Sequence, residues 1–175
     1  MSPDERRVRV ERLVADNYDE LRRIAHARLF RSGQITLLQT TDLVNETYLR
    51  VSNAGSFDPQ DRLQFLAYAA RAIRSIIVDY VRTRGAQRHG GGAVHVTLAT
   101  GLAGEPAGET DILAIDGALA QLRALDEHLA TIVELRFFAG ISEDEIAQSL
   151  GVSERTVRRH WEKARRVLAT ILADD

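Results

Sequence analysis

The chain of 175 residues contains no cysteine and only 3 prolines, and its apolar residues form no long uninterrupted run. Without cysteine, disulfides and thiolate metal sites are excluded, which suits a reducing cytoplasm. No apolar stretch approaches the length needed to cross a bilayer, and the first residues, MSPDERRVRVERL, are too charged for a signal peptide. We therefore expect a cytoplasmic protein with no membrane partner.

Residue patterns typical of enzyme sites are also missing. The 5 histidines show no metal-ligand spacing; they are His26, His89, His95, His128 and His160. The triple glycine at 90–92 is followed by neither lysine nor a hydroxyl residue, so it does not match a phosphate-binding loop. We therefore predict no catalytic residue, no metal site and no cofactor, and we expect that the protein is not an enzyme.

Alanine, leucine and arginine are abundant, and valine and isoleucine recur at helical rather than alternating positions. The predicted helices cover about Val8–Phe30, Thr41–Val51, residues 63–84, a segment starting near Asp111, Asp126–Phe138, Ser142–Leu150 and Ser153–Leu172. Residues 85 to about 110 lack helical periodicity and are rich in glycine, alanine and threonine, as linkers are. The expected fold is all-α, with a helical domain at 1–88, a linker at 89–110 and a second helical domain at 111–175.

Residues 141–168, ISEDEIAQSLGVSERTVRRHWEKARRVL, contain two short helical patterns joined by Gly-Val-Ser. Ser142 with Glu145 has the spacing of a capping box, Gly151 supplies a left-handed helix end, and Ser153 can cap a second helix. Apolar residues recur along that second helix at spacings of three and four; they are Val157, Trp161, Ala164, Leu168 and Ile171. The segment therefore predicts a helix-turn-helix, although an isolated basic helix is more often a solvated face.

The formal net charge of −2 conceals two basic clusters. Residues 65–92 and residues 153–172 each carry a net charge of +4, whereas residues 93–140 carry −5. Binding to phosphates depends on local clusters rather than on the total charge. Two basic helices far apart in the sequence indicate two contacts with DNA.

Three segments resemble parts of a bacterial sigma-70 factor of the extracytoplasmic-function (ECF) group. LLQTTDLVNETYLRV is similar to the region-two helix that docks on the RNA polymerase clamp. FLAYAARAIRSIIVDYVRTRGAQRHGGG is similar to the helix that reads and melts the minus-ten element. VELRFFAGISEDEIAQSLGVSERTVRRHWEKARRVL is similar to region four, which reads the minus-thirty-five element. The resemblance covers nearly the whole chain.

The resemblance implies a factor that binds core RNA polymerase at the clamp coiled coil and the flap, directs it to promoter DNA and helps to open the duplex. An anti-sigma factor is a further candidate partner, because many relatives are held by one. The resemblance assigns contacts with the polymerase clamp to Asp42, Asn45, Glu46 and Arg50. The alternative for this set is the solvated face of an amphipathic helix.

The resemblance also assigns DNA contacts in both domains. The candidates at the minus-ten element are Phe57, Arg71, Arg74, Arg82, Arg84 and Arg88, with Phe57 as a stacking residue for a flipped base. The candidates at the minus-thirty-five element are Ser153, Arg155, Thr156, Arg158, Arg159 and Lys163. Tyr68 and Tyr80 are expected in the core.

The main alternative is an autonomous helix-turn-helix regulator that binds an operator as a dimer, with the first domain as a ligand or partner domain. Such a regulator has no need of the second basic helix at 71–88, which therefore favours the sigma factor.

Overall fold

The structure, a computed structural model, describes residues 3–31, 38–54, 61–87 and 109–174. The described residues form helices and no strand, which confirms the predicted all-α fold. The helices are α1 (Pro3–Asp16), α2 (Tyr18–Arg31), α3 (Thr40–Asn53), α4 (Arg62–Gln87), α6 (Glu109–Leu125), α7 (Glu127–Val133), the π-helix η2 (Glu134–Ala139), α8 (Glu143–Leu150) and α9 (Glu154–Asp174). None of them combines the length and apolar composition that a membrane-spanning helix requires.

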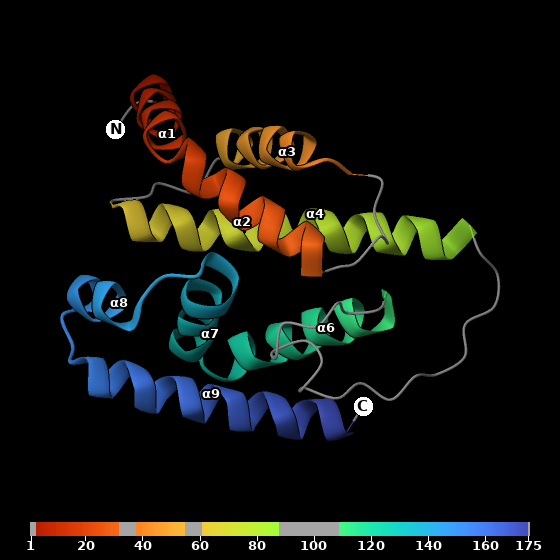
Figure 1. Ribbon diagram of the computed structural model, residues 1–175, viewed down its shortest axis with the longest axis vertical. Coiled ribbons are helices and arrows are strands. Elements are labelled where there is room, and N and C mark those ends of the chain that lie inside the picture. The colour runs from red at the N-terminus through yellow and green to blue at the C-terminus, as the bar shows by residue number, and fades with distance from the viewer. Residues whose placement is uncertain (1–2, 32–37, 55–60, 88–108, 175) are drawn as a thin grey trace.

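Helix α4, with 26 residues, runs through the middle of the molecule (Figure 1). Helices α1, α2 and α3 lie on one side of it, and α6, α7, α8 and α9 lie on the other. Phe65, Leu66 and Ile73 of α4 are fully buried, together with Leu21 of α2 and Leu43 of α3. Burial of each such side chain contributes about 1.5–3 kcal/mol, so α4 organises the core of the N-terminal half.

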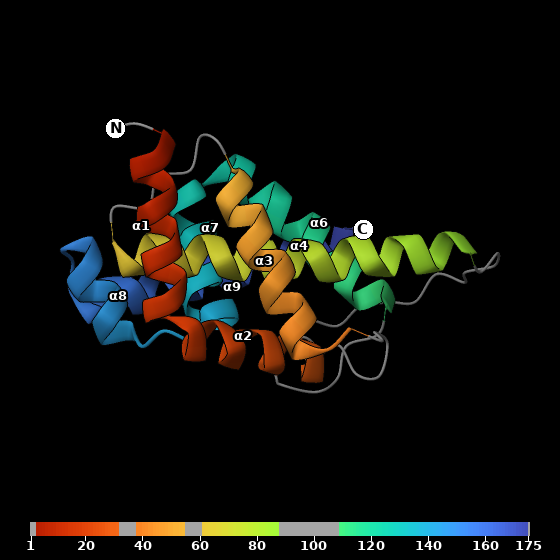
Figure 2. The same cartoon turned by 90° about the horizontal axis from the view of Figure 1, so that it is seen from above.

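The single helix predicted over Val8–Phe30 is wrong, because the chain forms two helices that meet at Asn17. The Asn17 side-chain amide donates to the Leu13 carbonyl at 2.8 Å, and its oxygen accepts a bond from Arg62 Nε at 3.2 Å. Asparagine is a poor residue inside a helix because its side chain competes for backbone groups. Figure 2 shows α1 and α2 running in clearly different directions from this point.

Helix α3 begins one residue before the predicted start, and its N-cap is Gln39 rather than Thr41. The Asp42 carboxylate accepts a hydrogen bond from the Gln39 backbone N–H at 3.3 Å. This bond satisfies a donor at the helix start, where an acidic side chain also interacts favourably with the helix dipole. Asp42 therefore stabilises the helix on which the predicted docking residues lie.

The helix predicted over Asp126–Phe138 is α-helical only in its first half. Asp126 caps α7 by accepting a bond from the Leu129 N–H at 3.1 Å, and the chain continues as the π-helix η2. Gly140 ends it in the left-handed conformation, with φ of 70°. A π-helix widens the turn and often accompanies a functional site, and sequence periodicity does not predict it.

The helix-turn-helix is formed by α8, the turn after it and α9, as predicted. Ser142 accepts a bond from the Glu145 N–H at 3.2 Å, and its own N–H donates to the Glu145 carboxylate at 3.3 Å. Gly151 has a φ of 65° and ends α8. The predicted apolar seam of α9 faces inward: Val157, Ala164 and Leu168 are buried, and Trp161 and Ile171 are half-buried.

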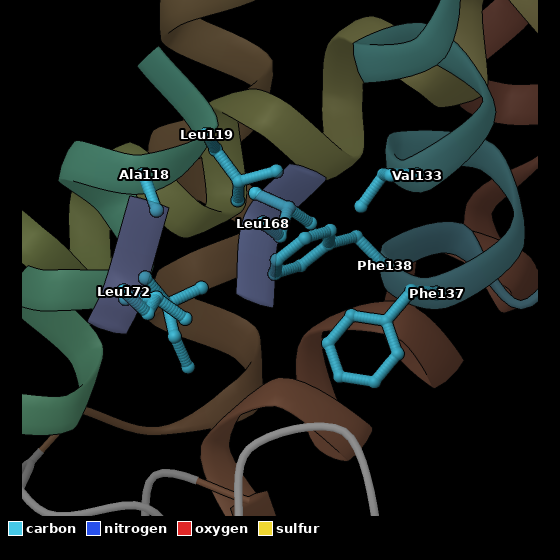
Figure 3. Close-up of a pocket in the computed structure, with 8 residues that line it drawn as sticks. Ala118, Leu119, Val133, Phe137, Phe138, Leu168 and Leu172 are labelled. Carbon is cyan, nitrogen blue, oxygen red and sulfur yellow. The ribbon is translucent and has the colours of Figure 1, made fainter. Parts of the chain in front are cut away.

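A small apolar pocket of about 20 Å³ lies where α6, α7, η2 and α9 meet (Figure 3). Its lining includes Leu119, Val133, Phe138, Leu168 and Leu172, and all of the lining side chains are apolar. A cavity of this size, without polar groups, has room for about one water molecule and nothing to bind it. The pocket is a packing gap rather than a ligand site.

The predicted linker at 89–110 lies almost entirely outside the described residues. At its N-terminal side, α4 continues to Gln87, so the prediction that helical structure ends before residue 85 is wrong. At its C-terminal side, α6 already begins at Glu109.

Candidate nucleic-acid interface

The start of α9 presents hydroxyl and guanidinium groups on its exposed side. Ser153 Oγ accepts a bond from the Thr156 N–H at 3.2 Å and lies 3.0 Å from the Thr156 hydroxyl oxygen. Arg155 and Arg159 are exposed, and neither forms an ion pair with the part of the chain that the structure describes. Lys163 is also exposed, with Nζ 3.6 Å from the Asp126 carboxylate. These cations are available to an anionic partner.

Arg158 differs from its neighbours because it is held by a carboxylate of the preceding helix. Its Nε and Nη2 donate to Glu143 Oε2 at 3.1 and 2.8 Å. Hydrogen bonding to Glu143 raises the pKa of Arg158 above its ordinary value. Glu143 also pairs with Arg136, whose guanidinium lies 4.8 Å from the centre of the Trp161 ring. A bidentate contact through Nε and Nη2 would require Arg158 to leave Glu143.

Two of the histidines are in contact, His128 of α7 and His160 of α9. The rings of His128 and His160 are in edge-to-face contact, with centroids 5.2 Å apart. Burial lowers the pKa of His160, and the nearby His128, Arg159 and Lys163 lower it further, against the opposite effect of Asp126. Among the described residues, no group of three or more histidine or carboxylate side chains could hold a metal ion.

The arginines of α4 divide into exposed and paired side chains. Arg71 is exposed, Arg84 is half-buried, and Arg82 is 60 % exposed with Nη2 3.4 Å from Asp116. Arg74 is only 13 % exposed and pairs with Asp116 of α6 and with Glu134 of η2. The structure thus places Arg74 between the two halves, although the resemblance assigned it to the minus-ten element. Phe57 and Arg88 lie outside the described residues.

Helices α3 and α4 enclose an open pocket of about 410 Å³ with an acidic rim. Asp42, Glu46 and Asp79 line it, together with Arg50. Arg50 Nη2 donates to Asp79 at 2.9 Å, Nη1 donates to Ser75 at 3.0 Å, and Nε lies 3.4 Å from Glu46. Burial opposes the charge of Arg50, but hydrogen bonds with Asp79 and Glu46 outweigh it and raise its pKa. Arg50 therefore links α3 to α4 and orients both carboxylates.

Together, these surfaces comprise a helix-turn-helix with exposed cations, a second arginine-rich helix and an acidic pocket beside it. A model of the ECF sigma factor family matches residues 6–174. The chain belongs to the ECF sigma factor family. Searches of curated proteins and of solved structures found no match.

Family membership places this ECF sigma factor in transcription initiation, with RNA polymerase and promoter DNA as the partner classes, and not among enzymes. The structure brings some of the predicted residues together: Asp42, Glu46 and Arg50 share the α3–α4 pocket, and Arg74 and Arg82 share Asp116. Asn45 is exposed on α3 and does not line that pocket. The basic residues of α9 form a separate group from those of α4.

Sequence reasoning on this sigma factor missed the acidic partners of its arginines. Asp79, Asp116, Glu134 and Glu143 each bind an arginine that was assigned to DNA or polymerase. The net charge of −5 over residues 93–140 was the available signal for two of them, because Asp116 and Glu134 fall in that segment. The net charge of a segment does not predict which helices pack together, so it could not predict these ion pairs.

Proposed function

We propose that this ECF sigma factor binds core RNA polymerase through the exposed side of α3, directs it to promoters and assists their opening. Helix α4 and its arginines would contact the minus-ten element, and the start of α9 would contact the minus-thirty-five element. The observation that carries the proposal is the match of the ECF sigma factor family over residues 6–174.

The polymerase-binding part is supported by the exposure of α3. Asp42 and Asn45 are exposed and Glu46 is half-buried at the rim of the α3–α4 pocket. Leu49, on the same helix, is 51 % exposed, although leucine is more often buried. An exposed apolar side chain bordered by polar ones supports an interaction site on this helix.

The DNA-binding part is supported by the two basic helices. Arginine can bind guanine with two hydrogen bonds in the major groove, and a helix-turn-helix places the start of its second helix there. Arg155 and Arg159 have no ion pair to break among the described residues, whereas Arg158 is already paired with Glu143. We therefore assign Arg155 and Arg159 to the first contacts with the promoter.

The test is the affinity of the purified chain for core RNA polymerase without DNA, measured by fluorescence anisotropy. We expect tight stoichiometric binding that Glu46→Ala weakens roughly tenfold, the change that results from losing one well-placed charged contact. Glu11→Ala is the matched control, because Glu11 pairs with Arg7 at the same i,i+4 spacing as Glu46 with Arg50.

Equal affinities of Glu46→Ala and Glu11→Ala would remove the docking assignment on α3. Absence of any binding by a folded wild-type chain would contradict the proposed function and favour an autonomous regulator of an operator.

A further inference from the structure

Glu143 of α8 contacts two arginines that come from different helices. Its Oε1 pairs with Arg136 of η2, and its Oε2 accepts bonds from Arg158 Nε and Nη2 at 3.1 and 2.8 Å. The Glu143 side chain is only 15 % exposed, whereas that of Arg158 is 64 % exposed. A largely covered carboxylate thus holds an exposed arginine of the candidate DNA-binding helix.

The two bonds with Glu143 occupy one edge of the Arg158 guanidinium. The group is a planar fork, in which Nε and Nη2 form one edge, and Nη1 with the second N–H of Nη2 forms the other. Within the part of the chain that the structure describes, Nη1 of Arg158 makes no hydrogen bond. Two parallel N–H groups are therefore available on the outer edge. They match the O6 and N7 acceptors of guanine in the major groove.

Glu143 is itself held in place by its second partner. The Arg136 guanidinium lies 4.8 Å from the centre of the Trp161 ring, and Trp161 is half-buried in the apolar seam of α9. Arg136 is consequently held between η2 and α9, and it holds one oxygen of Glu143 while the other oxygen directs Arg158. A functional side chain keeps one geometry when the groups that support it are themselves fixed.

We propose that Glu143 is a positioning residue that makes Arg158 a reader of guanine in the minus-thirty-five element rather than a phosphate contact. The inference rests on the proposed function, because it assumes that the start of α9 enters the major groove. Arg158 is the residue that touches the base, and Glu143 acts through it.

Charge distinguishes Arg158 from the other two arginines at the start of α9. Residues three and four apart lie on the same side of a helix, so Arg155, Arg158 and Arg159 share one face. Arg155 and Arg159 form no ion pair with described residues, and their full charge is available to phosphates. Arg158 and Glu143 together are neutral, and a phosphate would have to displace the carboxylate or lie close to it. The guanine edge is uncharged, so it accepts two hydrogen bonds without that repulsion.

Holding Arg158 in place before DNA binds also favours selectivity. A long side chain loses rotamer freedom when it binds, which weakens the contact. Glu143 already restricts Arg158, so less freedom is lost when guanine is bound. The same restriction keeps the guanidinium from turning to a neighbouring base or phosphate. A wrong base at this position is therefore not compensated by another contact of Arg158.

The test is the selection of DNA by holoenzyme assembled from the full chain and core polymerase. The probe is a duplex library randomised over both promoter elements, and sequencing of the bound fraction gives the base preference at each position. We expect the wild type to prefer guanine at one position of the minus-thirty-five element by roughly tenfold or more, and Arg158→Ala to lose that preference. Glu143→Gln should reduce the same preference roughly fivefold, although Arg158 is still present.

Glu154→Gln is the matched control for the change of charge. Glu154 lies in the first turn of α9, and its charge contributes to the raised pKa of Arg158, after the larger effect of the hydrogen bond with Glu143. Both glutamine variants remove one negative charge close to the DNA, so both should bind a duplex of arbitrary sequence more tightly. Only Glu143→Gln should lower the preference for guanine.

Arg158→Lys is a second variant that does not depend on how well Glu143→Gln folds, because Arg158 is exposed. Lysine keeps the charge but cannot donate two parallel bonds from one planar group. A phosphate contact would tolerate this change, whereas a guanine reader would not. We expect the preference for guanine to fall roughly tenfold in Arg158→Lys, with affinity for a duplex of arbitrary sequence retained.

Equal guanine preferences in Glu143→Gln and Glu154→Gln would overturn the positioning role. So would a loss in Glu143→Gln that affects every position of the minus-thirty-five element alike, because damage to the fold of the helix-turn-helix predicts that result. An unchanged preference in Arg158→Lys would overturn the reading of guanine by Arg158. A wild-type holoenzyme that selects no sequence at all would contradict the proposed function as well, so the two failures are distinguishable.

Discussion

At the scale of single residues, carboxylates shared between cations recur in this molecule. Glu143 holds Arg136 and Arg158, Asp116 holds Arg74 and Arg82, and Glu134 holds Arg74 and Arg123. A carboxylate that is shared between two arginines holds both side chains in place. Another anion can still replace it as the partner of either arginine. Phosphate offers the same geometry with more charge, so it can displace the protein acid.

The Arg158 side chain gives the residue-scale prediction. Arg158→Ala should weaken binding of the holoenzyme to its promoter roughly tenfold, because a bidentate contact in the groove is lost. Its affinity for core polymerase should not change. The measurement is promoter binding by gel shift with saturating polymerase. Arg165→Ala serves as the control, since Arg165 is exposed on α9 and pairs only with Glu162 among the described residues. Equal promoter affinity of the two variants would remove Arg158 from the interface.

At the scale of helices, the sequence predicted features whose causes are local. The capping box of Ser142 with Glu145, the glycine end at Gly151 and the apolar seam of α9 each depend on residues a few positions apart, and all three are present. The kink at Asn17 and the π-helix η2 were missed. The first involves Arg62, which is distant in sequence, and the second packs against arginines of the other half.

Two glycines at helix ends give the element-scale prediction. Gly140 and Gly151 both have left-handed φ angles, so alanine at either position should cost about 1 kcal/mol of unfolding free energy. An added Cβ at Gly140 would also lie 3.0 Å from Arg23 Nη1, whereas at Gly151 no described atom outside the adjoining residues and the helix's own backbone lies within 4 Å of such a Cβ. Gly140→Ala should therefore destabilise more than Gly151→Ala.

The measurement is chemical denaturation of both variants, followed by circular dichroism. A loss for Gly140→Ala no larger than that for Gly151→Ala would contradict this order.

At the scale of the whole molecule, the relation of the two halves could not be predicted from the sequence. The charge of each segment was evident, with +4 over residues 65–92 and −5 over residues 93–140. Whether such segments face each other or face separate partners depends on packing between helices that are distant in the chain. For the same reason, Arg74 was assigned to DNA and Asp116 was given no role, and the ion pair between them was not predicted.

The whole-molecule prediction concerns salt. Arg82 is 60 % exposed and both members of the Arg62–Glu145 pair are about 45 % exposed, so these contacts between the halves are open to screening. The Debye length falls from about 10 Å at 0.1 M to about 3 Å at 1 M. The free energy of unfolding should therefore fall as NaCl is raised from 0.1 to 1 M, measured by urea denaturation followed by circular dichroism. Arg82→Gln should reduce that dependence, because it removes one of the screened pairs.

The complementarity of the two halves also bears on self-association. The arginines lie on one half and their acceptors on the other, so the same contact can form between the N-terminal half of one molecule and the C-terminal half of a second. Two halves that belong to the same chain meet at an effective concentration on the order of 1 mM. Intramolecular closure therefore dominates at micromolar protein. At millimolar protein, exchanged dimers compete with it, so the dimer fraction should rise with protein concentration in sedimentation measurements.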